Sequence, residues 1–114
     1  MKRPITLNLY KERRLEISYK DINALVNNST YSFVIEGIKT TLNSEEFTRE
    51  NNEFKFNLDI KNKQATYLLK EQNTLFDIDV EKINLKKENN NIILEYKISS
   101  DESELKIELI DKDE

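Results

Sequence analysis

Two charged residues, Glu36 and Arg49, are the first candidates for a binding site. Glu36 closes an alternating segment that starts at Tyr31, and Arg49 is the only arginine after residue 14. An arginine side chain suits two-pronged contact with a carboxylate or a phosphate, whereas a buried charge without a partner is costly. If both side chains point inward, they can fix an anionic or polar ligand. The alternative interpretation is a structural cross-strand pair or a solvated rim.

Three tyrosines on expected strands, Tyr31, Tyr67 and Tyr96, form a second candidate set. Tyrosine combines an apolar ring with a polar hydroxyl, so these residues could form the wall of a ligand cavity. They could equally be packed in a core. The phenylalanines on neighbouring strand positions are large and numerous, which favours a mostly filled interior.

Three acidic residues, Asp77, Asp79 and Glu81, alternate along one expected strand. Carboxylates that share a strand face could bind a hard cation such as Ca²⁺, or act as a pair in glycoside hydrolysis. No calcium-binding loop accompanies them, so we expect a solvated outer face that discourages edge pairing, and no metal site.

The composition excludes much of enzyme chemistry. The 114 residues include no Cys, His or Trp, one Gly and one Pro. Disulfides, thiolate nucleophiles, zinc–cysteine sites and histidine-based triads are therefore excluded, and one glycine cannot form a glycine-rich phosphate loop. Catalysis would depend on carboxylates and tyrosine, so we favour a non-enzymatic protein and expect no cofactor.

The charge and hydropathy of the chain limit the kinds of partner that we expect. The chain carries 18 Lys and Arg against 22 Asp and Glu, a net charge of −4, and the two signs are interleaved. Nucleic-acid binders usually show a basic stripe, so we expect no nucleic acid as partner. No apolar run approaches the roughly 18 residues of a membrane helix. We therefore expect a soluble, cytoplasmic protein with no membrane partner.

The strands that must position these residues are predicted from a sequence pattern that repeats every two residues. Apolar and polar residues alternate in segment after segment, which indicates strands with one buried and one wet face. Asn and Asp replace most of the Gly and Pro expected at turns, at 27–28, 51–52, 62, 73, 89–91 and 100–101. The expected strands are 5–11, 14–25, 30–36, 38–42, 46–50, 53–60, 64–70, 74–86, 91–99 and 103–110.

Strands joined by such short turns form antiparallel hairpins, and closing them into a barrel removes the aggregation-prone edges of an open sheet. The segments 14–25 and 74–86 are long enough to bend across both sides of a barrel. We predict an all-β fold, an up-and-down antiparallel β-barrel of about 8–10 strands in a single domain, 1–114. A β-sandwich is the alternative.

Several segments also carry a family resemblance. Residues 31–36 are a tyrosine-led strand ending in Glu36, residues 47–49 have an apolar-x-Arg pattern, and 3–9, 15–17, 38–42, 76–80 and 92–96 match further strands. Together they resemble the YwiB-like family, a small bacterial family with a calycin-like (lipocalin-like) β-barrel. The resemblance implies that fold and no assigned activity.

The leading hypothesis is a small barrel that binds a small-molecule ligand at one mouth, near Glu36, Arg49 and Tyr31. Such a role calls for a connected cavity of roughly 300 Å³ or more with convergent polar groups. The alternative is a protein-interaction module, for example a homodimer through an exposed strand or an outer face.

Overall fold

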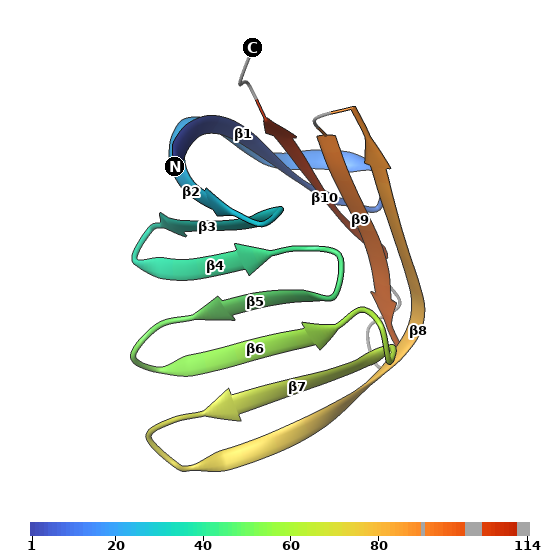
Figure 1. Ribbon diagram of the computed structural model, residues 1–114. Coiled ribbons are helices and arrows are strands. Elements are labelled where there is room, and N and C mark those ends of the chain that lie inside the picture. The colour runs from blue at the N-terminus through green and yellow to red at the C-terminus, as the bar shows by residue number, and fades with distance from the viewer. Residues whose placement is uncertain (90, 100–103, 112–114) are drawn as a thin grey trace.

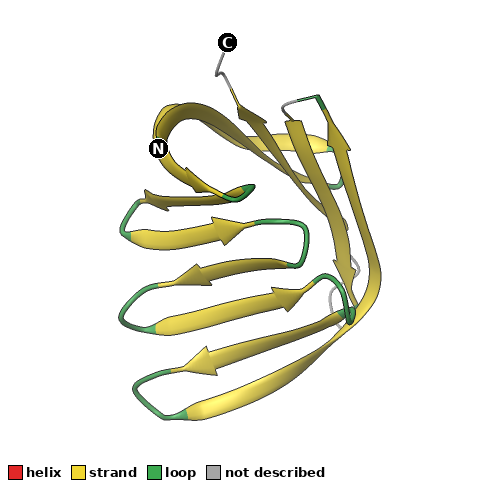
Figure 2. Ribbon diagram, in the orientation of Figure 1, coloured by secondary structure: helices red, strands yellow, loops and turns green. Residues whose placement is uncertain are grey.

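A computed structural model describes residues 1–89, 91–99 and 104–111. The described chain is all-β, with strands joined by turns and loops (Figure 2). Ten antiparallel strands follow one another around a closed barrel, and β1 pairs with β10 to complete it (Figure 1). The strands are β1 (Lys2–Lys11), β2 (Arg14–Asn27), β3 (Thr30–Ile35), β4 (Ile38–Leu42), β5 (Glu46–Glu50), β6 (Phe54–Asp59), β7 (Gln64–Leu69), β8 (Thr74–Glu88), β9 (Asn91–Ile98) and β10 (Glu104–Asp111).

The predicted fold class is confirmed as an up-and-down barrel, and each of the ten expected strands has its counterpart. β1 begins three residues earlier than expected, and β8 continues to Glu88. Residue 103 of the last expected strand lies outside the described residues, as do the turn positions 90 and 100–101. No helix among the described residues is long and apolar enough to cross a membrane.

The turns form although the chain has only one glycine. Other residues adopt positive φ, or accept hydrogen bonds from the backbone of the turn. Glu36 (φ 51°) and Gly37 (φ 78°) form the two-residue turn between β3 and β4, a geometry that matches the twist of hairpin strands. Asn51 shows the second device: its Oδ1 accepts hydrogen bonds from the backbone N–H of Glu53 and Phe54, at 2.8 and 3.0 Å. Asn43 caps the preceding β4–β5 turn in the same way.

Bulges in β2 and β8 bend these long strands from one side of the barrel to the other, and β2 has a further register shift between the pairs Leu9–Ile17 and Tyr10–Leu15. Between the pairs Ile5–Ile22 and Leu7–Tyr19, two β2 residues oppose one β1 residue, and Asp21 has a positive φ of 56°. Such an insertion bends a strand and shifts its inward-facing positions by one residue. Glu81 is the matching extra residue of β8. Up to Asp79 this strand pairs with β7, and from Val80 it pairs with β9.

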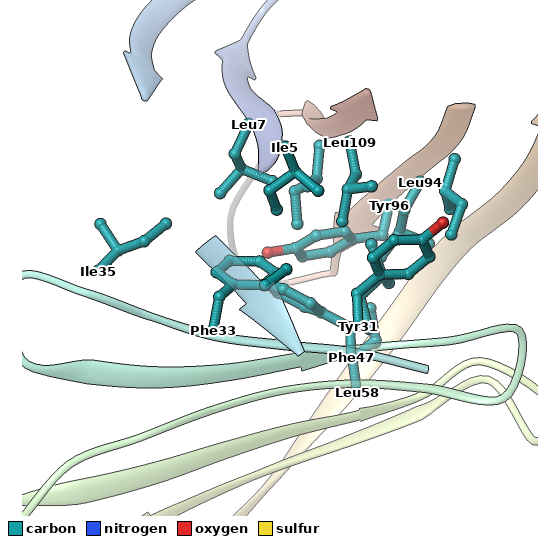
Figure 3. Close-up of a cluster of buried hydrophobic side chains, with 14 of the residues drawn as sticks. Ile5, Leu7, Tyr31, Phe33, Ile35, Phe47, Leu58, Leu94, Tyr96 and Leu109 are labelled. Carbon is teal, nitrogen blue, oxygen red and sulfur yellow. The ribbon is translucent and has the colours of Figure 1, made fainter. Parts of the chain in front are cut away.

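The inward-facing side chains fill most of the interior. Fifteen buried apolar residues form one cluster that draws on nine of the ten strands, and Figure 3 shows aliphatic side chains packed around its aromatic rings. The cluster contains Ile5, Leu7, Ala24, Tyr31, Phe33, Ile35, Leu42, Phe47, Leu58, Ala65, Ile92, Leu94, Tyr96, Ile107 and Leu109. Burial of these residues is the main stabilising contribution to the fold.

Candidate functional site

The barrel wall opens where β2 and β3 diverge. The two strands pair at only three positions, from Leu25–Ser32 to Asn27–Thr30. Beyond them β3 follows β4, whereas β2 bends at the Asp21 bulge and follows β1 (Figure 1). Because neither strand pairs with the other beyond these positions, the backbone hydrogen bonds of the barrel wall are interrupted here.

A pocket of about 170 Å³ has Tyr19 of β2 and Ile35 of β3, the strands on either side of this opening, among its lining residues. Its volume is below the roughly 300 Å³ typical of drug-sized ligands, and close to the ~150 Å³ of an apolar cavity that holds one benzene. The inner part is formed by buried side chains: Leu7, Ile35, Thr40, Phe47, Tyr96 and Ile107. The outer part is formed by partly exposed ones: Leu9, Tyr10, Tyr19, Arg49, Leu105 and Lys106.

Arg49 faces the barrel interior. It pairs with Thr40 on β4 and Phe56 on β6, and since directly opposed residues share a face of the sheet, it lies on the inner side with them. Its side chain lines the pocket and is only partly buried. Within the described part of the chain, no residue forms an ion pair or a hydrogen bond with the Arg49 guanidinium. Its positive charge is therefore available to a ligand.

Glu36 lies in the β3–β4 turn beside the same opening, and its side chain is exposed. The Tyr19 hydroxyl donates a hydrogen bond of 3.2 Å to Glu36 Oε2, which links β2 to the end of β3 across the gap. Partial burial raises the pKa of Tyr19, the Glu36 carboxylate adds to this shift, and the charge of Arg49 opposes it. Glu36 and Arg49 thus both act on Tyr19, without an ion pair between them in the described residues.

Two buried residues that line the pocket, Tyr96 and Thr40, carry hydroxyl groups. Burial raises the pKa of Tyr96 to about 12, and the charge of Arg49 opposes that shift. The Tyr96 ring packs against Phe47 and Phe56, with both centroids 6.4 Å away. The second hydroxyl belongs to Thr40, which is 2% exposed, and its Oγ1 has no hydrogen-bond partner among the described residues.

Tyr31 lies on the other side of the core from this pocket. Its hydroxyl donates a 2.7 Å hydrogen bond to Asp111 Oδ2, and Arg3 forms a 2.9 Å ion pair with the same oxygen. In Figure 3 the phenolic oxygens of Tyr31 and Tyr96 lie on opposite sides of the cluster. The structure therefore brings Arg49 and Glu36 to one opening, but places Tyr31 in a separate network.

Tyr67, the third tyrosine of the set, belongs to the aromatic packing of the β6–β8 sheet. Its ring stacks on Phe54 at 5.5 Å between centroids and an interplanar angle of 7°. It shares its row of the sheet with Phe56, but does not line the Arg49 pocket.

The acidic residues of β8 lie away from the pocket. Asp77 and Asp79 are opposite Thr66 and Gln64 of β7 and are exposed. The bulge residue Glu81 forms an ion pair of 3.6 Å with Lys97. No group of three potential metal-ligating residues occurs among the described residues.

Sequence reasoning did not single out Tyr19, Thr40 or Lys106, which the fold brings to Arg49. The Lys106 ammonium stacks over the Tyr10 ring at 4.8 Å, at the edge of the pocket. One signal was available: Thr40 is a hydroxyl residue between the aliphatic Ile38 and Leu42, at positions that share its face.

Comparison with known proteins adds no relative, because no family model, curated protein or solved structure matches the chain.

Proposed function

We propose that this barrel binds a small organic anion in the pocket between β2 and β3, with Arg49 as the contact for the negative charge. The observation that carries the proposal is the Arg49 guanidinium, which faces the interior pocket without a partner among the described residues. A guanidinium that faces a pocket without a protein partner is available to a ligand of opposite charge, and arginine is suited to two-pronged contact with a carboxylate.

The rest of the lining supports an amphipathic ligand. Leu7, Leu9, Ile35, Leu105 and Ile107 surround the space with aliphatic carbon, and burial of an apolar group there contributes favourable free energy. An anion with a small apolar group satisfies both features. Inorganic phosphate or another fully polar anion would leave this apolar surface uncovered.

Titration of the ¹⁵N-labelled protein with benzoate, butyrate and inorganic phosphate tests the proposal by NMR. We expect the two carboxylates to shift amides of β4, β5 and β10 around the pocket, with phosphate weaker. Arg49→Gln should weaken benzoate binding by about 10- to 100-fold, since a hydrogen bond to a charged group contributes roughly 1.5–3 kcal/mol. Lys55→Gln, which removes an exposed charge outside the pocket, is the matched control. Absence of carboxylate binding at millimolar concentration, or equal binding by Arg49→Gln, would contradict the proposal.

A homodimer through β2 is the second candidate, favoured by an edge without a neighbour. Residues 14–24 of β2 pair only with β1, and no described strand pairs with their other edge. Leu15 and Ile17 on this stretch are 54% and 44% exposed. Antiparallel pairing of two β2 strands about Ser18 would place Glu16 opposite Lys20 of the second copy, and oppositely charged cross-strand pairs are favourable.

Charge exchange tests this register. Glu16→Lys and Lys20→Glu should each weaken dimerisation, because each places like charges opposite one another, and the double variant should restore it. Analytical ultracentrifugation over a range of concentrations measures the effect. A wild-type chain that remains monomeric throughout, or a double variant no better than the single ones, excludes this interface.

We also propose membership of the YwiB-like family and a cytoplasmic location. The first is supported by the segment resemblance and by the closed barrel, which is consistent with a calycin-like fold. The second is supported by the absence of cysteine from the sequence.

A further inference from the structure

The buried hydroxyl of Thr40 is the feature of the pocket that anion binding alone does not explain. Thr40 is one of the residues that line the pocket, and its Oγ1 is buried without a hydrogen-bond partner among the described residues. Buried polar groups in proteins are nearly always paired with protein, water or ligand. Valine would fill the same volume without this cost, so the hydroxyl points to a polar group that enters the pocket.

The burial of the polar residues in the pocket indicates which end of a ligand would lie deeper. Thr40 is almost fully buried, whereas Arg49, directly opposite on β5, is partly exposed and carries its charge at the end of a long side chain. Tyr96, which is 8% exposed, also lines the pocket. A ligand that meets both regions therefore has its anionic group near the outer side and a neutral hydrogen-bonding group at its inner end.

We infer that the pocket selects monocarboxylates of single-ring size that carry a hydroxyl group distant from the carboxylate, and that Thr40 binds this hydroxyl. The inference rests on the proposed function and specifies its ligand class. The volume of about 170 Å³ accepts one six-membered ring, since a cavity of ~150 Å³ holds benzene. A threonine hydroxyl can both donate and accept, so it pairs with a phenolic or alcoholic group without a change in charge.

Isothermal titration calorimetry with benzoate, 3-hydroxybenzoate and 4-hydroxybenzoate tests the inference. We expect the wild-type protein to bind at least one hydroxylated isomer roughly fivefold more tightly than benzoate, the gain from one neutral hydrogen bond. Thr40→Val should reduce this ratio to about one. Thr40→Ser, which keeps the hydroxyl, should retain the preference, and Thr41→Val makes the same chemical change on the outer face of β4 as a control.

The outcomes separate this inference from the proposed function. If benzoate binds through Arg49 but neither hydroxylated isomer binds more tightly, the hydroxyl inference fails and anion binding stands. If Thr40→Val weakens benzoate and its hydroxylated forms equally, Thr40 contacts the shared carboxylate and the inference is overturned. If none of the three carboxylates binds, both proposals fail together. Thermal unfolding of each variant verifies that the fold is intact, and Tyr96→Phe provides a second variant that removes the other hydroxyl of the pocket lining.

Discussion

Removal of the Tyr31 hydroxyl should weaken the fold measurably at neutral pH. This hydroxyl donates a 2.7 Å hydrogen bond to Asp111 Oδ2, and the Asp111 side chain is 1% exposed. A hydrogen bond to a charged group contributes about 1.5–3 kcal/mol. Tyr31→Phe keeps the ring in the core, so we expect a loss of about that size in the free energy of unfolding, or a fall of roughly 6–12 °C in Tm for a domain of this length.

The same variant makes a prediction about alkaline pH. Burial, followed by the hydrogen bond and the charge of Asp111, raises the pKa of Tyr31 to about 12, while Arg3 opposes the shift. Because the folded-state pKa is the higher one, this residue's contribution is complete below pH 10 and is lost as the pH rises towards 12. At pH 11 the wild-type protein should have lost on the order of 1 kcal/mol through Tyr31, a loss that Tyr31→Phe does not suffer. The stability gap between the two proteins should therefore narrow.

Urea unfolding followed by circular dichroism at pH 7, 9, 10 and 11 measures that gap. Tyr10→Phe is the control, because the Tyr10 hydroxyl makes a longer, 3.3 Å hydrogen bond to Glu108 that water can replace. We expect the control to lose less than about 1 kcal/mol at pH 7. A gap between wild type and Tyr31→Phe that is absent at pH 7, or that stays constant up to pH 11, would refute this account of the Asp111 network.

Three further perturbations test the turns and the core. Glu36→Asn should increase the free energy of unfolding by up to about 1 kcal/mol and so raise Tm slightly. Asn tolerates the positive φ better than Glu does, and the exposed hydrogen bond from Tyr19 contributes little. A clear drop in Tm would contradict this. Leu94→Ala should cost about 2–5 kcal/mol in urea unfolding since Leu94 is fully buried, whereas Leu75→Ala, at a residue 60% exposed, should stay within about 0.5 kcal/mol. Asn51→Ala should cost about 1 kcal/mol by the same assay, because two backbone N–H groups lose their acceptor.

The alternation of apolar and polar residues predicted the strands, because one face of each strand must be buried. Closure into a barrel was predicted from the cost of open sheet edges, with a β-sandwich left as the alternative, and the structure shows the barrel. The positions of the turns were predicted from asparagine. This prediction is confirmed at Asn51, because its side-chain oxygen accepts two hydrogen bonds from the backbone that follows. The turn at Glu36 carries no such signal, because glutamate seldom adopts positive φ. There the pairing of β3 with β4 imposes the conformation.

The inward direction of Arg49 was also within reach of the sequence, since Phe47 two residues earlier is buried and shares its face. Its neighbours in space were not. Thr40 is nine residues away along the chain, and only the β4–β5 register places it directly opposite Arg49. Tyr19 and Tyr96 come from distant strands that approach only when the barrel closes. A periodic pattern specifies which face a residue occupies, but not which residues meet across the interior.

The opening between β2 and β3 depends on a change of phase in the alternation. Before the bulge the inward positions of β2 are Ile17 and Tyr19, and after it they are Ile22 and Ala24. The single extra residue at Asp21 turns the strand away from β3, so the wall parts where the phase changes. β8 shows the same shift at Glu81, and there the strand exchanges one neighbour for another without a gap. The two strands differ in their partners on either side of the bulge. β8 changes there from β7 to β9, whereas β2 keeps β1 as its partner throughout and pairs with β3 only at its last three residues. Tyr19 of β2 and Ile35 of β3 both line the pocket although their strands are not paired at these positions, so the candidate site lies where two neighbouring strands are not joined.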